Sequence, residues 1–147
     1  MPVGDVMTVR VVSVAPDTTV QEAITRMLEE GIGAVAVCDG TRLVGIFTER
    51  DVLRIAGEGP ARFDALTIET VMTPRPLTIS PEDDILEAAA LMAAKRIRHL
   101  PVCQGEFLVG MIGIRDLMGR LVEEAARQDL RAHETARSLL ARQAPAS

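Results

Sequence analysis

The stretch VCDGTRLVGIFTERD, residues 37–51, returns later in the chain as VCQGEFLVGMIGIRD, residues 102–116. The offset of 65 residues holds without a gap when the alignment is extended outward, so that residues 6–54 align with residues 71–119. Of the 49 aligned pairs, 17 are identical. Self-similarity at a fixed spacing indicates that one structural unit has been duplicated within the chain.

Each copy of the unit begins with an apolar run that predicts a strand. Proline cannot donate to a strand ladder, so Pro16 and Pro81 end these runs. The residues of the two predicted strands are Val9, Val11, Val12 and Val14 in the first copy and Leu77 to Ile79 in the second.

A helix is predicted next in each copy. Thr19 and Glu22 stand at the spacing of a capping box, as do Asp84 and Glu87. An apolar stripe at helical spacing follows each cap, with the members Val20, Ala23, Ile24, Met27 and Leu28 in the first copy and Ile85, Ala88, Ala89, Met92 and Ala93 in the second. Gly31 ends the first helix, and Arg96 occupies its place in the second.

Two short apolar runs, Ala34 to Cys38 and Leu43 to Phe47, flank Asp39-Gly40, which is a hairpin signal. Gln104-Gly105 takes the turn position in the second copy, and charged residues open a further helix at Glu49 or Ile114. Each unit therefore reads β-α-β-β-α, which makes the fold class α+β. A unit of about 50 residues buries its sheet face poorly alone, so we expect the copies to pack face to face about a pseudo-twofold axis.

This pattern divides the chain into four parts. Residues 1–56 form the first repeat, 57–70 a Gly/Pro-interrupted linker, 71–121 the second repeat, and 122–147 a C-terminal helix with a disordered tail. The apolar positions of that helix are sparse. It is therefore either a solvated terminal helix that frays or an arm that packs on a partner subunit.

The composition argues against several classes of function. The net charge is −5 and aromatic residues make up 2%, so nucleic-acid binding is disfavoured. No apolar run approaches the 18 residues of a membrane span, and the start of the chain does not look like a signal peptide, so we expect a cytoplasmic protein. Cys38 and Cys103 are too few for a disulfide framework and read as buried small hydrophobic residues. We find no catalytic set and no metal-ligand spacing.

The unit closely resembles the CBS domain, named for cystathionine β-synthase. The resemblance covers residues 3–121 and rests on the order and spacing of VMT at the start of each unit, the two strand-ending prolines, IRHLPV (97–102), LVGIFTERD (43–51) and LVGMIGIRD (108–116). It implies paired βαββα units, often dimerised into a flat disc. It also implies that an adenosyl ligand such as AMP, ADP or ATP binds in the cleft between the repeats.

The family motif G-h-h-[ST]-x-x-D contacts ribose and phosphate, and here it corresponds to Gly45, Thr48 and Asp51. An ionised carboxylate can accept both hydroxyl protons of a ribose cis-diol, and free N–H groups at a helix N-terminus favour anions. The same Thr48-x-x-Asp51 spacing is also an ordinary helix-capping pattern.

The resemblance assigns the other side of the ligand to the second repeat. Arg98 and His99 would contact phosphates, and Pro101 would lie against the ligand. The pocket for the base would be formed by Pro76, Leu77 and Thr78, with Ile46 opposite. The alternative for Arg98 and His99 is a solvated helix C-terminus, where cations are favoured.

The pseudo-symmetric second site is poorer. Asp116 and Met111 are present, but Gly113 stands in the place of Thr48. Gly33 and Ala34 replace the basic pair. We therefore predict one strong site and one weak or empty site per chain.

From these residues we expect a non-catalytic regulatory module that binds an adenine nucleotide as its regulatory ligand, requires no cofactor, and forms a homodimer that acts on an unidentified effector protein. The alternative is a structural or protein-interaction module whose nucleotide site is vestigial.

Overall fold

The structure is a computed structural model, and it describes residues 1–60 and 62–143. The disordered tail predicted from the sequence falls on residues 144–147, outside the described residues. The expected α+β fold class is confirmed, with both copies following the order strand, helix, two strands and helix. The first repeat comprises β1 (Ser13–Val14), α1 (Val20–Glu30), β2 (Ala34–Asp39), β3 (Arg42–Thr48) and α2 (Glu49–Gly57). The second comprises β4 (Thr73–Pro74), α4 (Ile85–Lys95), β5 (His99–Gln104), β6 (Phe107–Gly113) and α5 (Ile114–Gln143).

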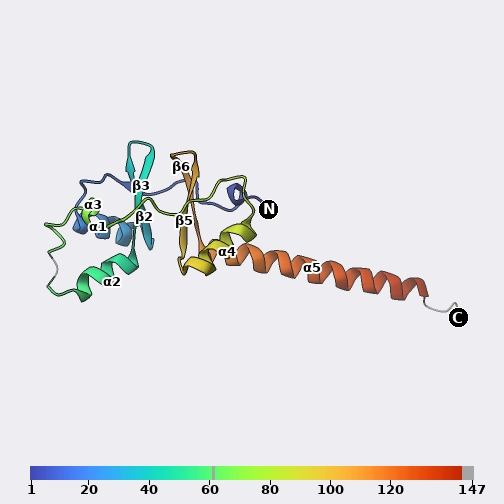
Figure 1. Ribbon diagram of the computed structural model, residues 1–147. Coiled ribbons are helices and arrows are strands. Elements are labelled where there is room, and N and C mark those ends of the chain that lie inside the picture. The colour runs from blue at the N-terminus through green and yellow to red at the C-terminus, as the bar shows by residue number, and fades with distance from the viewer. Residues whose placement is uncertain (61, 144–147) are drawn as a thin grey trace.

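The two hairpins form at the predicted places and stand next to each other at the centre of the molecule, with α1 and α2 on one side and α4 and α5 on the other (Figure 1). All strands belong to one sheet in the order β1-β2-β3-β6-β5, with β4 pairing to β3. The halves of this sheet meet at the hairpin tips. There the N–H of Leu43 donates to the carbonyl of Glu106 (3.0 Å) and the N–H of Leu108 donates to that of Thr41 (3.1 Å).

The helix caps agree with the sequence in the first repeat and differ in the second. Thr19 and Glu22 form the predicted capping box. The side chain of Asp84 instead accepts from the N–H of Leu86 (2.8 Å), and no capping box with Glu87 forms. The reason is that the second carboxylate oxygen of Asp84 is taken by the N-terminal ammonium group of Met1, at 2.9 Å.

The first strand of each unit is shorter than predicted. Only Ser13 and Val14 are paired in the first copy, and Val9 is 72% exposed. In the second copy the expected strand Leu77 to Ile79 is reduced to a single bridge between Ile79 and Val102. Neighbouring prolines explain this second difference, because Pro74 and Pro76 have no N–H to offer a ladder.

The helical stripes are narrower than predicted. Leu28 is 78% exposed, and Ala93 is exposed too, so the last member of each stripe faces away from the core. The remaining stripe residues belong to two separate hydrophobic clusters, one in each repeat.

The segment that precedes each repeat in the sequence packs into the hydrophobic core of the other repeat. Ile68, in α3 (Ile68–Val71), is fully buried in the core of the first repeat. Its counterpart at the 65-residue offset is Val3, in the short 3-10 helix η1 (Val3–Asp5), which is fully buried in the core of the second repeat. The stretch predicted as a plain linker therefore carries a helix. It is also tied to the first repeat by bonds such as that from the N–H of Val20 to the carbonyl of Leu66 (2.8 Å).

This exchange depends on two glycines in the hairpins. A Cβ placed on Gly45 would lie 2.3 Å from the sulfur of Met72, and one on Gly110 would lie 2.5 Å from the sulfur of Met7. Each leading segment can therefore approach the opposite hairpin only because these strand positions lack a side chain.

The cysteines lie between the repeats. Residues of β2 alternate, so that Val35 and Val37 enter the first core while Ala36 and Cys38 face the other way. Cys38 and Cys103 are both buried, as predicted. Burial raises the pKa of both thiols, and the nearby Cys103 raises the pKa of Cys38 further.

The C-terminal helix is not a separate element. α5 runs unbroken from the last strand of the second repeat for 30 residues and projects away from the paired repeats (Figure 1). Its side chains from residue 125 to residue 142 are exposed. Among the helices of the described residues, none is long and apolar enough to cross a membrane.

Candidate functional site

The first part of the predicted site lies where β3 meets α2. Thr48 is the N-cap of α2, and its N–H donates to a carboxylate oxygen of Asp51 at 2.8 Å. The hydroxyl of Thr48 donates to the same oxygen at 3.3 Å. The capping arrangement that the sequence left open as an alternative is thus present. It uses mainly one of the two oxygens of Asp51.

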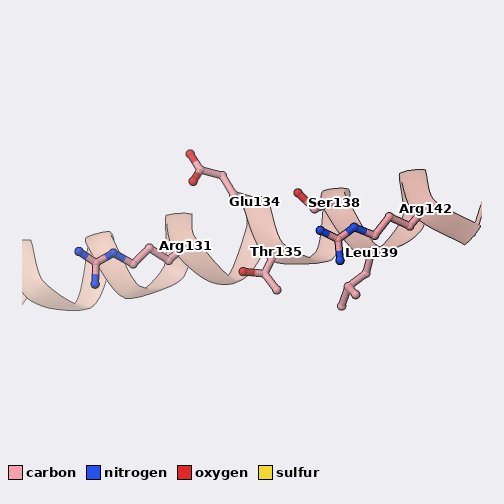
Figure 2. Close-up of a pocket in the computed structure, with 6 residues that line it drawn as sticks. All are labelled: Arg131, Glu134, Thr135, Ser138, Leu139 and Arg142. Carbon is pink, nitrogen blue, oxygen red and sulfur yellow. The ribbon is translucent and has the colours of Figure 1, made fainter.

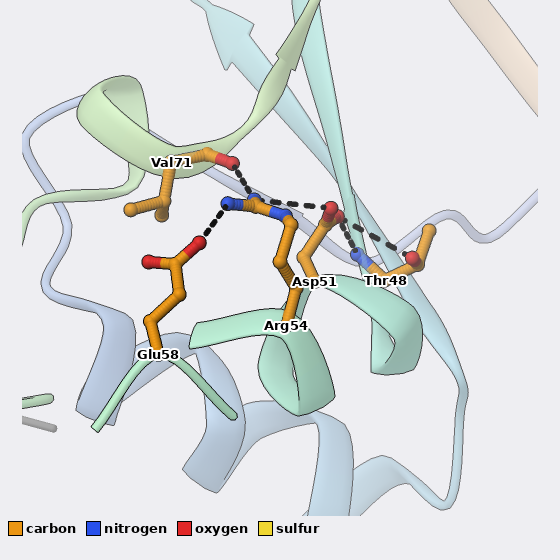
Figure 3. Close-up of polar contacts among 5 residues, drawn as sticks. All are labelled: Thr48, Asp51, Arg54, Glu58 and Val71. Atoms are coloured by element: carbon orange, nitrogen blue, oxygen red, sulfur yellow. Dashed lines mark hydrogen bonds and ion pairs between the residues drawn. The ribbon is translucent and has the colours of Figure 1, made fainter. Parts of the chain in front are cut away.

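The other oxygen of Asp51 faces an arginine that the sequence analysis did not single out. The guanidinium of Arg54 lies 3.5 Å from this oxygen, donates to the carbonyl of Val71 at 2.9 Å, and lies 3.6 Å from Glu58 (Figure 3). The side chain of Asp51 is consequently only 13% exposed. The sequence did contain a signal for Arg54, since its counterpart in the alignment is Gly119.

The predicted partner from the second repeat lies close to this helix start. A Cβ on Gly33 would be 2.9 Å from the carboxylate of Glu49 and 3.4 Å from the ring of His99. The start of β5 therefore lies against the first turn of α2. A hydrogen bond of 3.4 Å from Arg50 to the carbonyl of Arg96 joins the same two regions.

The ring of His99 is half-buried, and burial lowers its pKa. The carboxylate of Glu49 raises this pKa, and the guanidinium of Arg98 lowers it. Since burial is the largest of the three effects, His99 is mainly neutral at pH 7. A neutral ring has one N–H to donate and one nitrogen that accepts.

Arg98 and Pro101 differ sharply in exposure. The side chain of Arg98 is exposed, while its carbonyl accepts from the N–H of Ile114 at 2.8 Å. Pro101 is fully buried beside Met111 in the β5–β6 hairpin. Arg98 is therefore accessible from solvent, whereas Pro101 is not.

The predicted base pocket is brought together in part. Ile46 is 8% exposed and pairs with Thr73 of β4, three residues before Pro76. Pro76 is half-buried, whereas Leu77 and Thr78 are exposed. Within residues 1–60 and 62–143, no hydrogen bond joins Leu77 or Thr78 to the other predicted residues.

The second predicted site is more open than the first. Met111 bonds to Thr8 in both directions, at 2.8 and 3.0 Å. Asp116 is exposed, and together with Thr8 it lines a hollow of about 370 Å³. This hollow was not predicted from the sequence.

A second hollow of about 440 Å³ runs along the distal half of α5. Figure 2 shows that its lining side chains, from Arg131 to Arg142, all project from this one helix. It is the open surface between successive helical turns, and it places no converging polar groups around a ligand. In the part of the chain that the structure describes, no group of three or more His, Cys, Asp or Glu residues is arranged to hold a metal.

Comparison with known proteins accounts for both repeats. The family model for the CBS domain matches residues 3–58 and 68–134. The CBS domain-containing protein YhcV of Bacillus subtilis (strain 168) is 34% identical over 116 residues, which are 78% of this chain and 81% of YhcV. Several other curated relatives are longer, and the chain spans between 23% and 60% of their length.

Solved structures give the same result. A CBS-domain-containing protein from Agrobacterium tumefaciens has a TM-score of 0.74 and 31% identity, covering 82% of this chain and 98% of that one. The structure of CBSX2 in complex with AMP has a TM-score of 0.75 and 25% identity, covering 84% and 98%. The duplicated unit, the paired hairpins and these matches establish that this chain belongs to the CBS domain family.

Proposed function

We propose that this chain is a non-catalytic regulatory module that binds an adenosine-type nucleotide (AMP, ADP or ATP) between its two repeats. The observation that carries the proposal is the approach of the first turn of α2 to the start of β5. The residue of that turn that lies close to His99 is Glu49, which follows Thr48 directly and stands two residues before Asp51. This supports a site that Thr48 and Asp51 of one repeat share with His99 of the other. The similarity to CBSX2, whose structure contains AMP, supports an adenine ligand.

In this proposal Asp51 holds the ribose. One carboxylate oxygen is already used in capping α2, so the ribose hydroxyls would donate mainly to the oxygen that faces Arg54. The contact to Arg54 is long, at 3.5 Å, and therefore leaves room for a better donor. Arg54 would remain anchored by its 2.9 Å bond to Val71.

The phosphates would be bound from the second repeat. Arg98 offers an exposed planar fork, and the neutral ring of His99 offers one N–H. Ile46 and Pro76 would contact the base, with Pro101 behind it and the exposed Leu77 and Thr78 closing over it. The pseudo-symmetric site at Asp116 and Met111 would hold a nucleotide weakly, because it has neither the hydroxyl of Thr48 nor the basic pair.

The test is a titration of the whole chain with AMP, ADP and ATP while the thermal midpoint is recorded. A ligand at 100 times its dissociation constant stabilises the native state by about 2.7 kcal/mol, which corresponds to roughly 5–10 °C for a chain of this size. Arg98→Gln and Asp51→Asn should each reduce the shift, and the matched variant Asp116→Asn should leave most of it. If no nucleotide at millimolar concentration moves the midpoint of the wild-type chain, the proposal is wrong.

We also propose that two copies associate through their helices. Leu53 of α2 and Met118 of α5 are counterparts at the 65-residue offset, and they are 74% and 48% exposed. Leu28 of α1 adds a third exposed apolar side chain. Leu53→Glu combined with Met118→Glu should convert a dimer to a monomer in sedimentation. A wild-type chain that sediments as a monomer would contradict the proposal.

The second candidate function is a protein-interaction module. The projecting half of α5 favours it, because this segment exposes Leu130, Leu139 and Leu140 at 50% or more. Under this proposal α5 would pack on a partner subunit or protein, and nucleotides would leave the thermal midpoint unchanged. The titration above therefore separates the two candidates.

A further inference from the structure

The duplicated unit contains one polar cluster that is complete in the first repeat and incomplete in the second. In the first repeat the guanidinium of Arg54 lies among three acceptors, which are the carbonyl of Val71 (2.9 Å), the carboxylate of Asp51 (3.5 Å) and the carboxylate of Glu58 (3.6 Å). The 65-residue offset maps these acceptors onto Val6, Asp116 and Glu123, which are the same residue types. The arginine alone is missing, because its counterpart is Gly119.

The place of the missing side chain is open. The hollow of about 370 Å³ is lined by Gly119 and by all three retained acceptor residues, together with Thr8 and Arg120 among others. Within residues 1–60 and 62–143, no heavy atom lies within 4 Å of the position that a Cβ on Gly119 would take, its chain neighbours and its own helix backbone aside. The second repeat has thus kept the counterparts of the three acceptors around Arg54 but has no arginine at the equivalent position.

The charges of the hollow also favour a cation. Its lining holds three carboxylates, on Asp5, Asp116 and Glu123, and two guanidinium groups, on Arg115 and Arg120. Arg120 already pairs with Glu123 at 3.5 Å. In the part of the chain that the structure describes, Asp116 makes no ion pair or side-chain hydrogen bond, whereas Asp51 is bonded to Thr48 and Arg54. Among the described residues Asp116 is therefore a carboxylate of the hollow with no ion-pair partner, as is Asp5.

From this comparison of the two repeats we propose that the hollow at Gly119 binds a guanidinium group that comes from outside the chain. One terminal nitrogen of the planar group would donate to the carboxylate of Asp116 and the carbonyl of Val6, as Nη2 of Arg54 contacts Asp51 and Val71 in the first repeat. The other terminal nitrogen would face Glu123, as Nη1 of Arg54 faces Glu58. A point-like ammonium group has a single nitrogen, so it cannot place donors at Asp116 and Val6 on one side and at Glu123 on the other. The ligand is accordingly a molecule with a guanidinium, either a free small molecule or an arginine side chain within a peptide.

The first experiment titrates the whole chain with small probe molecules at millimolar concentration. Binding is followed through the amide shifts of Thr8 and Gly119 in ¹H–¹⁵N spectra. Methylguanidinium should bind at least tenfold more tightly than methylammonium, which has the charge but not the fork, and than N-methylurea, which has the shape but not the charge. L-arginine and N-acetyl-L-arginine amide distinguish the two sources, because only the second presents the side chain as a peptide does. Equal binding of methylammonium and methylguanidinium would overturn the proposal, as would shifts that AMP causes and that none of the guanidinium probes causes.

The correspondence between Arg54 and Gly119 in the two repeats suggests the variants to test. Gly119→Arg should fill the hollow and abolish the shifts, whereas the matched control Gly119→Ala should keep them. Asp116→Asn should weaken binding at least tenfold. Arg54→Gly should open an equivalent hollow in the first repeat and add a second binding site for methylguanidinium. Binding that persists unchanged in Gly119→Arg would refute the proposal.

A second test measures the stability of variants without any ligand, so its result does not depend on how tightly the probes bind. Gly119→Arg and Gly119→Lys gain similar helix propensity, but only arginine can reproduce the cluster of the first repeat. We expect the thermal midpoint of Gly119→Arg to exceed that of Gly119→Lys by a few degrees, and we expect Asp116→Asn to remove this difference. Equal midpoints would mean that the acceptors do not recognise a guanidinium.

Discussion

The exchange of leading segments makes Ile68 a critical core residue even though it lies in a stretch predicted to be a linker. Its side chain is fully buried in the cluster of the first repeat, while its N–H donates to the carbonyl of Thr18 at 2.8 Å. Ile68→Ala keeps that backbone bond and removes three buried carbons. At about 0.8 kcal/mol per carbon the transfer loss is roughly 2.4 kcal/mol, and the cavity brings the expected loss to about 2–5 kcal/mol.

Urea unfolding gives this loss directly, and thermal unfolding should show a midpoint lower by about 4–20 °C. Leu28→Ala is the matched control, since Leu28 is 78% exposed and should change stability by about 0.5 kcal/mol or less. Val3→Ala tests the mirror position, and because the two residues lie in different clusters their losses should add within about 0.5 kcal/mol. A loss below 1 kcal/mol for Ile68→Ala would refute the reasoning and leave residues 57–70 as a simple connection.

Three further perturbations test other parts of the structure. Gly45→Ala should lower the free energy of unfolding by about 1–3 kcal/mol, because the new Cβ would lie 3.0 Å from the carbonyl of Thr73 and would also contact Met72. Gly57 has open space around it, so Gly57→Ala should be neutral or stabilising in the same urea assay. Thr19→Ala should cost about 0.5–2 kcal/mol by removing the acceptor 3.1 Å from the N–H of Glu22, and thermal unfolding of the variant would measure it. Burial lowers the pKa of His99 in the folded chain, so as the pH falls the unfolded chain binds a proton at His99 before the folded chain does. The free energy of unfolding is therefore unaffected by His99 above about pH 6.5 and decreases below that pH. Between pH 7.5 and 5.5, urea midpoints should therefore fall more for the wild type than for His99→Gln, and equal falls would contradict the lowered pKa.

The hairpins and helices were predictable because their signals are local. Asp39-Gly40 specifies a tight turn through the positive φ of its glycine, which is 63° in the structure. Thr19 and Glu22 satisfy the first free N–H groups of α1 without help from the rest of the chain. Such features depend on a few neighbouring residues, and a sequence displays them directly.

The exchange of segments was not predictable in this way. Ile68 carries no local sign that its side chain enters the first repeat and not the second, because that choice depends on contacts between residues far apart in the chain. The same holds for Asp84, whose capping geometry was altered by the ammonium group of Met1, 83 residues away. The hollow at Gly119 was missed for a different reason. The alignment displayed the exchange of Arg54 for glycine, but the acceptors around Arg54 became apparent only from the fold.

The two repeats are therefore unequal in two independent respects. The first site has Arg98 and His99, which have no counterparts in the second site, whereas Arg54 contacts the carboxylate of the first site and Gly119 leaves the carboxylate of the second site open. Under the proposed function, the first difference determines which site offers donors to the phosphates of a nucleotide. The second difference determines whether an arginine of the chain already contacts the carboxylate of the site. A nucleotide in the first site has to share Asp51 with Arg54, while a cation in the second site meets Asp116 unpaired among the described residues. Duplication has preserved the framework, and under the two proposals the substitutions at these few positions would suit the two carboxylates to ligands of different charge.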